Sequence, residues 1–495
     1  MKKNRMRFTA LAMSLVMAAA LAACSGADTN TAAETVTETI SVEESAAETW
    51  QTGVSETEAS ETETAETKSR VPSEEDIEIT ESYGSDVDGE HAIEADGEEA
   101  SYSNIGVSKT GDSEGDEADF YGENAAVFAT NGATLTIADS LVVTNGTHAN
   151  GIFSYGEGTT VNVSDSVIET SGNCSGGIMT TGGGTMNASN LNIHTTGNSS
   201  AAIRSDRGGG TVNVEEGSYV TEGTGSPVIY STADITVSDA YMESTSSQGV
   251  VVEGKNSVTL NDCELLADNN SKNSDKSDYY QAVMIYQSMS GDAASGTSSF
   301  EMNGGSLVNK NGDIFFVNNT ACEIKLSNAR ITNEDEEGIF LRAEAAGWGN
   351  EGSNGGKINF TAADQEINGD MIVDDVSVLN LYLTEKSSFA GAINTDGQAG
   401  SVYVELDEGS TWTLTGDSYI SGLTCDADAI NLNGYTLYVD GQAYTAGTES
   451  AGEAFEIVSA DSDSGMGGEG MPEMPDGEGH GPGGDGEEPP AKPGE

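Results

Sequence analysis

Short alternating segments that recur at a nearly constant spacing predict an all-β protein, wound as a right-handed parallel β-helix of about a dozen coils. Segments such as Thr160–Val163 and Thr211–Val214 alternate polar and apolar residues, which is the period of a half-buried strand. Their last residues form a column with steps of 25, 26, 23 and 23 residues: Val163, Ala188, Val214, Val237 and Leu260. Three such strands per repeat, separated by Gly and Asn, describe one coil.

Two further apolar columns keep the same step. One column contains Val142, Ile168, Ile193, Tyr219, Met242 and Leu265, and the other contains Ile152, Ile178, Ile203, Ile229 and Val252. A turn column contains Gly146, Gly172, Gly197 and Gly223. Each strand would pair with its equivalent one coil on, about 4.8 Å away, so these apolar residues should fill the interior while Glu169 points outward. Parallel crossovers are almost always right-handed, which gives the expected hand.

Later steps in the first column are longer. Leu260 to Met302 spans 42 residues and Leu326 to Phe360 spans 34. The extra residues form two polar loops, 268–280 and 344–357. Insertions of this kind gather on one lateral surface of a solenoid, which is often its binding face.

The N-terminus predicts export and a lipid anchor. Residues 1–23 have the basic and then apolar segments of a signal peptide. The end of that segment, Leu21-Ala22-Ala23-Cys24, resembles the lipobox of bacterial lipoproteins. This resemblance implies cleavage before Cys24 and a diacylglyceryl thioether on its sulfur, and thus a protein held by this lipid at the extracellular face of the cell membrane.

Composition divides the rest of the chain into three parts. Residues 24–100 should form a disordered tether, because residues 25–100 contain 23 acidic and 2 basic side chains with few large apolar groups. The β-helix is expected over 101–460. Residues 461–495, which are rich in Gly, Pro, Met and acid, should form a disordered tail.

The charge and the cysteines exclude some functions. The chain has 83 acidic and 19 basic residues and a formal charge of −64, which disfavours a nucleic-acid partner. No C-x-x-C or Cys/His pairing appears in the sequence, so nothing indicates zinc. Isolated buried thiols are the expected state of the four later cysteines, Cys174, Cys263, Cys322 and Cys425.

These repeats resemble the right-handed β-helix proteins of the pectate-lyase-like superfold, with Asn145, Asn173 and Asn198 placed like an asparagine ladder. Three segments, Tyr102–Ala129, Gly177–Thr185 and Ala201–Gly210, are similar to adhesin-like β-helix lipoproteins of Gram-positive anaerobes. The resemblance covers most of residues 101–460. It implies the fold, and a fold alone implies no activity.

The run Arg204-Ser205-Asp206-Arg207 before three glycines is a candidate binding site. Arg204 should face outward, in the column of Phe153, Met179 and Tyr230. A guanidinium recognises carboxylates through two parallel hydrogen bonds, so Arg204, Asp206, Arg207 and Tyr230 would suit an acidic sugar. The alternative is an Arg–Asp pair that braces a turn, with the glycines supplying positive φ.

A candidate calcium loop begins at Asp112. Asp112, Glu114, Asp116 and Glu123 lie at positions 1, 3, 5 and 12 of such a loop, and their hard oxygen ligands suit calcium. The expected glycine at position 6 is replaced by Glu117, and no flanking helix is expected. The alternative is a solvated acidic loop. No other cofactor is indicated.

No familiar catalytic motif is present. The Gly-His-Gly and Arg-Ile-Lys elements of polygalacturonases are missing, and Asp374-Asp375 is an isolated acidic pair. The leading interpretation is therefore a surface binding or adhesion protein that recognises a polysaccharide or cell-surface glycan through a lateral face. The alternative is a polysaccharide lyase or glycoside hydrolase with an unrecognised site, and a third interpretation is a structural spacer.

Overall fold

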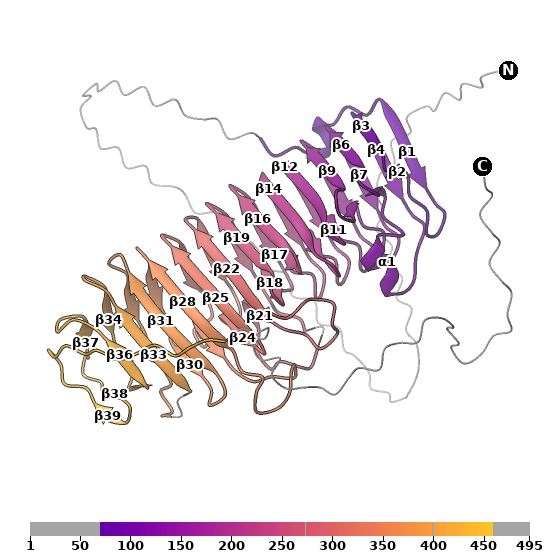
Figure 1. Ribbon diagram of the computed structural model, residues 1–495. Coiled ribbons are helices and arrows are strands. Elements are labelled where there is room, and N and C mark those ends of the chain that lie inside the picture. The colour runs from indigo at the N-terminus through magenta and orange to yellow at the C-terminus, as the bar shows by residue number, and fades with distance from the viewer. Residues whose placement is uncertain (1–69, 273, 398–399, 459–495) are drawn as a thin grey trace, which may run out of the picture. The chain divides into compact units, whose positions relative to one another are not determined.

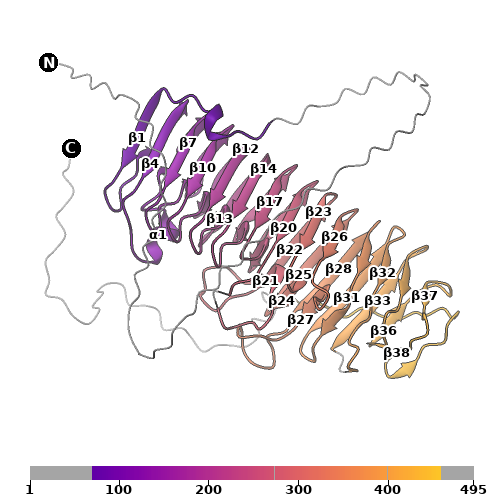
Figure 2. The ribbon, with the colours of Figure 1, turned by 180° about the vertical axis from the view of Figure 1, so that it is seen from behind.

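A computed structural model describes residues 70–272, 274–397 and 400–458, which form a parallel β-helix. The chain steps round three faces and returns to the first face one coil further on, so that equivalent strands stack along the domain (Figures 1 and 2). The signal peptide, Cys24 and the tail 461–495 lie outside the described residues.

A 21-stranded sheet covers the first and second faces, because β12 (Gly184–Thr195) and β14 (Gly210–Thr221) continue through the corner between them. The other first-face strands are β3 (Glu99–Ser103), β6 (Thr134–Ala138), β9 (Thr160–Ser164), β16 (Asp234–Ser238), β19 (Ser257–Asn261), β22 (Thr297–Asn303), β25 (Ala321–Ser327), β28 (Lys357–Ala363), β31 (Val378–Thr384), β33 (Ser401–Leu406) and β36 (Gly422–Thr424). The other second-face strands are β1 (Glu81–Ser85), β4 (Ile105–Lys109), β7 (Leu141–Thr144), β10 (Val167–Thr170), β17 (Tyr241–Ser244), β20 (Glu264–Ala267), β23 (Ser306–Asn309) and β26 (Arg330–Asn333). A four-stranded sheet follows β26: β29 (Glu366–Asn368), β32 (Ser388–Ala390), β34 (Thr411–Thr413) and β37 (Ile430–Asn431).

An 11-stranded sheet forms the third face. Its strands are β2 (Ile93–Asp96), β5 (Val127–Thr130), β8 (Ile152–Tyr155), β11 (Ile178–Thr181), β13 (Ile203–Ser205), β15 (Ile229–Ser231), β18 (Val250–Glu253), β21 (Gln281–Tyr286), β24 (Asp313–Asn318), β27 (Leu341–Ala343) and β30 (Met371–Val373). A three-stranded sheet lies near the C-terminal end: β35 (Ser418–Ile420), β38 (Leu437–Val439) and β39 (Gln442–Ala443).

The predicted columns are the stacked interior of the solenoid. Ile168 pairs with Val142 in the preceding coil and with Ile193 in the next, and all three side chains are buried. Val163 and Ile178 are likewise paired and buried in their own columns. Like residues therefore pack on like residues through one continuous core.

Two predicted steps were wrong by two residues. Ile229 pairs with Val250 and not with Val252. Leu326 pairs with Ala362, while Phe360 pairs with Ile324. A slip of two residues keeps a side chain on the same face of its strand, so alternation alone does not reveal it.

The Asp, Asn and Gly residues of each repeat lie at the corners between faces, where the backbone has to turn. One left-handed residue turns the chain between the first and second faces of several coils, with φ between 47° and 56°: Asp139, Asp165, Asn190, Asp239, Asp262 and Asn328. Asp and Asn tolerate this conformation best among residues with a side chain. The predicted glycine column lies at the next corner, where a Cβ on Gly172 would lie 1.9 Å from the carbonyl oxygen of Gly146.

Asparagine side chains also link the coils at this second corner. The backbone N–H of Asn198 donates to Oδ1 of Asn173, and that of Thr224 donates to Oδ1 of Asn198, both at 3.0 Å. Asn145, the third residue of the expected ladder, does not follow this pattern. Its backbone N–H donates to the carbonyl oxygen of Lys109.

Folded structure begins earlier than predicted. Residues 70–80, including the 3-10 helix η1 (Glu74–Asp76), lie along the outside of the coils, and Asn192 donates to the carbonyl oxygen of Pro72 at 2.9 Å. Strands β1 and β2 and the start of β3 then lie inside the range 24–100 that was assigned to a tether. His91, also assigned to the tether, stacks on Phe128 with 4.4 Å between ring centroids. Acidic residues at outward positions lower the mean hydropathy of these strands without disturbing the fold, so composition did not reveal them.

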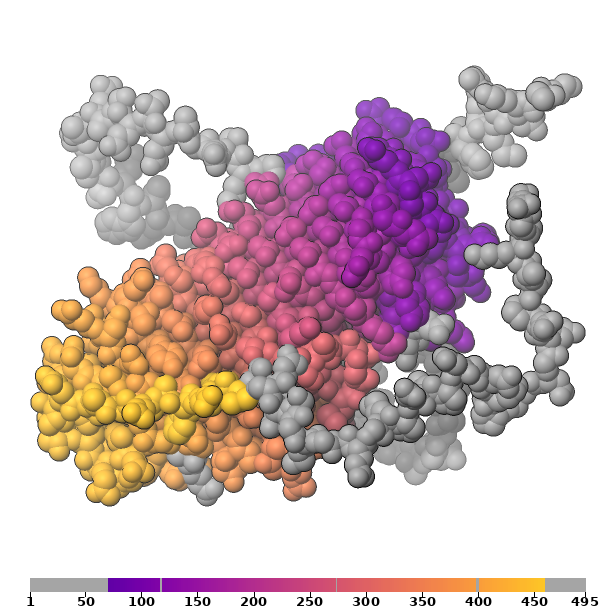
Figure 3. Space-filling view, in the orientation of Figure 1, coloured from indigo at the N-terminus to yellow at the C-terminus, as the bar shows by residue number. Residues whose placement is uncertain are grey.

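The last described residues return over the first face. Ser450 pairs with Cys425, and the backbone of Phe455 exchanges two hydrogen bonds with the side chain of Asn380. Figure 3 shows this segment as a yellow band across orange coils. Neither η1 nor the helix α1 (Asp116–Tyr121), the two helices of the described part, is long and apolar enough to cross a membrane.

Candidate functional site

One column of outward side chains runs the length of the third face. Its members stack in register: Glu94, Phe128, Phe153, Met179, Arg204, Tyr230, Val251, Met284, Phe316, Arg342 and Ile372. Several are large and apolar although they point away from the core. Phe128, Phe153 and Met179 are buried in a cluster beside α1, and Val251, Met284 and Phe316 are buried in a second cluster under the inserted loops.

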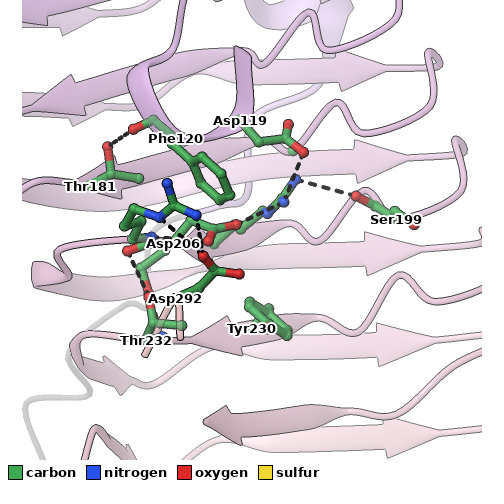
Figure 4. Close-up of polar contacts among 12 residues, drawn as sticks. Asp119, Phe120, Thr181, Ser199, Asp206, Tyr230, Thr232 and Asp292 are labelled. Carbon is green, nitrogen blue, oxygen red and sulfur yellow. Dashed lines mark hydrogen bonds and ion pairs between the residues drawn. The ribbon is translucent and has the colours of Figure 1, made fainter. Parts of the chain in front are cut away.

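Arg204 faces outward as predicted, but its guanidinium pairs with two carboxylates of the protein itself. Its Nη2 donates to Asp119 of α1 at 3.2 Å and to Asp206 at 3.0 Å, and its side chain is only 12% exposed (Figure 4). Burial alone would raise the pKa of Asp119, but the charge of Arg204 and the hydrogen bond with His148 hold it below its usual value. Arg204 therefore fixes α1 to the solenoid and is not available to an acidic sugar.

The other residues of the predicted sugar site diverge. Arg207 donates to Asp292 and lies 3.8 Å above the ring of Phe120, while the hydroxyl of Tyr230 donates to Glu253. Gly208 and Gly209 have φ of 86° and 60°. The alternative interpretation, an Arg–Asp pair at a turn with glycines at positive φ, therefore describes the local geometry.

The inserted loops instead form a pocket with Tyr230 in its wall. It has a volume of about 230 Å³ and five aromatic rings in its lining: Tyr230, Tyr279, Tyr280, Tyr286 and Trp348. Strands β15, β18 and β21 contribute to its wall, and the buried side chains of Val251 and Met284 belong to its lining. The prediction that both insertions share one lateral surface is confirmed, because the backbone N–H of Gly347 in one loop donates to the carbonyl oxygen of Lys276 in the other at 2.7 Å.

Cations support the pocket rings in a chain that has few cations. Lys272 lies 5.0 Å from the ring centroid of Tyr280, and Lys276 lies 5.7 Å from that of Trp348. Both lysines line the pocket. Arg342 holds Tyr279 from below, with its guanidinium carbon 3.7 Å from the ring centroid. Two of the few cations of a strongly negative molecule therefore lie in the lining of this pocket.

A buried carboxylate orders the inner wall of the pocket. Oε2 of Glu253 accepts hydrogen bonds from the hydroxyls of Tyr230 and Tyr286. Burial raises the pKa of both phenols. Oε1 of Glu253 is also buried and has no hydrogen-bond partner among the described residues. The two tyrosines are therefore held in place by a shared acceptor.

The predicted calcium ligands do not converge in the described part of the chain. The exposed Asp112 carboxylate accepts the backbone N–H of Thr147 at 2.8 Å, so it links one coil to the next. Glu114 and Glu123 are exposed, and neither belongs to a three-ligand cluster of described residues. Nothing is described of the Asp116 side chain. Helix α1, which was not expected, begins at this position.

A different cluster unites three residues that the sequence does not connect. Ligand atoms of Asp119, His148 and Cys174 all lie within 4.8 Å of one another. His148 Nδ1 is 3.0 Å from Asp119 Oδ1. The expectation of buried thiols holds for Cys263, Cys322 and Cys425, whereas Cys174 is half-buried. The separations of 29 and 26 residues give no short motif, and only the coil repeat places His148 and Cys174 together.

Comparison with known proteins adds no assignment. No family model matches the chain, and no curated protein or solved structure matches it.

Two remaining features are weaker candidates. A shallow groove of about 590 Å³ follows the first face along stacked amides, including Asn162, Asn187 and Asn213, and no aromatic ring lines it among the described residues. Asp374 accepts the backbone N–H groups of Ala345 and Val376, as expected of a turn residue. The aromatic pocket is therefore the best-formed candidate for ligand binding.

Proposed function

We propose that the protein is a surface-anchored binding protein that recognises an acidic polysaccharide in the pocket under loops 268–280 and 344–357. The observation that carries this proposal is the set of five aromatic rings in one pocket beside two lysines. Flat rings offer apolar area to the C–H face of a sugar, and surrounding polar groups orient its hydroxyls.

The size and charge of the pocket suggest the part of the polymer that it holds. A volume of about 230 Å³ is below the roughly 300–1,000 Å³ of sites for drug-sized ligands. It suits one or two sugar units of a chain that continues into solvent. Lys272 and Lys276 favour a carboxylate or sulfate on that unit, because they are rare cations in a chain of charge −64.

The lining favours binding over hydrolysis. Glycoside hydrolysis generally uses two carboxylates about 5–10 Å apart. The described residues that line the pocket include no Asp or Glu. Binding needs only the rings, amides and cations that the lining provides.

The anchor and location belong to the same proposal. A lipid on Cys24 would hold the protein at the outer face of the cell membrane, and the acidic residues that follow would set the pocket away from that surface. Repulsion of this acidic segment from anionic surfaces favours such a spacing.

The test is affinity electrophoresis of the full chain through gels that contain either a neutral polysaccharide or polygalacturonate. We expect retardation by the uronate polymer that falls at least tenfold in Trp348→Ala, which removes one ring of the pocket. Lys276→Gln should weaken retardation by polygalacturonate and leave a neutral polymer unaffected. Tyr435→Ala, an exposed aromatic residue outside the pocket, is the matched control.

The same incubations separate binding from cleavage. Retardation that is equal in Trp348→Ala and Tyr435→Ala would contradict the proposed site. Release of reducing or unsaturated sugar ends by the wild-type chain would favour the alternative, a lyase or hydrolase.

A further inference from the structure

The second corner of the solenoid places an imidazole and a thiol one coil apart. His148 and Cys174 occupy equivalent left-handed positions, with φ of 56° and 54°, and the N–H of His148 donates to the carbonyl oxygen of Asn173. Successive coils stack at about 4.8 Å, so the two side chains leave the corner side by side. Helix α1 brings Asp119 over this pair.

We infer that Asp119, His148 and Cys174 bind a divalent transition-metal ion of the zinc class. Thiolate, imidazole and carboxylate are the three protein ligand types of zinc, whereas calcium takes oxygen ligands alone. Bond lengths of about 2.0–2.3 Å in a tetrahedron separate neighbouring ligand atoms by about 3.3–3.6 Å. The three ligand atoms lie within 4.8 Å of one another, and the closest pair, His148 Nδ1 and Asp119 Oδ1, is 3.0 Å apart. A slight separation of this pair and a contraction of roughly 1 Å at the widest pair complete the site.

The surroundings of the three ligands are those of a supported metal site. Arg204 binds Oδ2 of Asp119, which leaves Oδ1 on the side of His148. Arg204 is itself held by Asp206 and by the carbonyl oxygen of Ser199. Such outer contacts orient a ligating carboxylate and tune the affinity of the site.

The site also has access and an available coordination position. The side chains of His148 and Asp119 keep 13% and 12% of their surface exposed, and Cys174 is half-buried. This opening is too small for a sugar but sufficient for a single ion. Three protein ligands leave a fourth position of the tetrahedron for water. Binding converts the Cys174 thiol to a zinc-bound thiolate and releases its proton to solvent. The imidazole of His148 binds as the neutral tautomer protonated at Nε2, so the hydrogen that Nδ1 donates to Asp119 is given up when the ion takes its place.

The experiment titrates Zn²⁺ into the full chain, with Cys24→Ser to remove that sulfur, in competition with a chromophoric zinc indicator. We expect one equivalent of tightly held zinc above the weak binding of the acidic surface. Co²⁺ should give a thiolate-to-metal charge-transfer band. His148→Asn and Cys174→Asn keep a residue that tolerates the left-handed conformation, and each should lower zinc affinity at least 100-fold. The cobalt band should disappear in Cys174→Asn.

The matched control is His194→Asn. His194 also contacts two carboxylates, Glu169 and Glu222, but it lies on the outer face of β12 and outside the metal cluster. This variant should keep the tight equivalent. Loss of zinc in His194→Asn with retention in Cys174→Asn would overturn the inference, as would the absence of any tight equivalent in the parent chain.

Discussion

Side-chain direction is the property that the alternation predicts best, residue by residue. Ile168 lies between Val142 and Ile193 in the core, and the next residue, Glu169, points outward beside His194. Two neighbouring positions of one strand therefore have opposite environments. A change of charge should therefore lower the stability of the fold strongly at Ile168 and only slightly at Glu169.

We expect Ile168→Asp to destabilise the fold by several kcal/mol, roughly 3–5, because it buries an unpaired carboxylate against two apolar neighbours. Glu169→Gln, one residue away, should change stability by less than about 1 kcal/mol. Thermal melts followed by circular dichroism measure both. Equal melting temperatures for the two variants would show that the assigned register is wrong.

His194 should make stability depend on pH. Hydrogen bonds from the imidazole to Glu169 and Glu222 raise its pKa to about 9 in spite of its partial burial. A raised pKa means that the folded state holds the proton more tightly than the unfolded state, whose pKa is about 6.5. The stabilisation is therefore complete below about pH 6.5 and is lost as the pH rises through 9.

The variant His194→Gln isolates this contribution. A third of the His194 side chain is exposed, so water weakens the pairs and we expect only about 0.5–1 kcal/mol. The melting temperature should differ most from that of the wild type at pH 6 and least at pH 10. A difference that grows with pH would contradict the assigned charge state.

The predicted sugar site shows where residue-level reasoning fails. The outward direction of Arg204 followed from its column, but the partner Asp119 lies 85 residues earlier in the sequence. Whether an outward arginine is free or paired depends on what covers it, and a cover from a distant insertion leaves no local pattern. The same reason explains why the Asp119–His148–Cys174 cluster could not be predicted.

At the scale of elements, helix α1 and the two inserted loops pack over the third face and form much of its outer surface. Helix α1 has six residues, too few for a helical periodicity to be read. It packs near the outer cluster of Ala125, Phe128, Phe153 and Met179. The position of a residue within the repeat predicts the strands of the solenoid. The insertions between strands carry side chains that no repeat position predicts.

We expect Phe120→Ala to loosen α1 and to lower stability by about 2–4 kcal/mol, because Phe120 is 9% exposed and packs under the Arg207 guanidinium. Its neighbour Tyr121 is 39% exposed, so Tyr121→Ala should cost less than about 1 kcal/mol. Denaturant unfolding measures both. If Tyr121→Ala costs as much as Phe120→Ala, α1 is not held as described.

At the scale of the whole molecule, the 23–26-residue repeat made the fold predictable because each coil repeats the same three strands and corners. The ends of the domain were less predictable. The exposed positions of β1 and β2 include Glu81, Glu94 and Asp96, and the residues between and after these strands are also rich in acid, so the region 81–100 continues the acidic composition that precedes it. A boundary drawn from composition therefore fell twenty residues after the start of the first strand, at Glu81, and later still than residues 70–80, which lie along the coils.

The lipid anchor is a whole-molecule prediction that concerns residues outside the described part. Cys24→Ala in the full chain should move the protein from the membrane fraction to the medium, since the lipid is the proposed anchor. Metabolic labelling with a fatty acid checks the modification directly. An unlabelled wild type that stays in the membrane fraction to the same extent as Cys24→Ala would contradict it.

Hydrogen–deuterium exchange with and without saturating polygalacturonate tests the central proposal most directly, because it locates a bound polymer on the native chain. We predict slower exchange in loops 268–280 and 344–357 and in β21, which line the pocket, with no change along the amide groove of the first face. Trp348→Ala should lose this protection, and Tyr435→Ala should keep it. Protection confined to the groove or to the Arg204–Arg207 turn, with the two loops unchanged, would contradict the account.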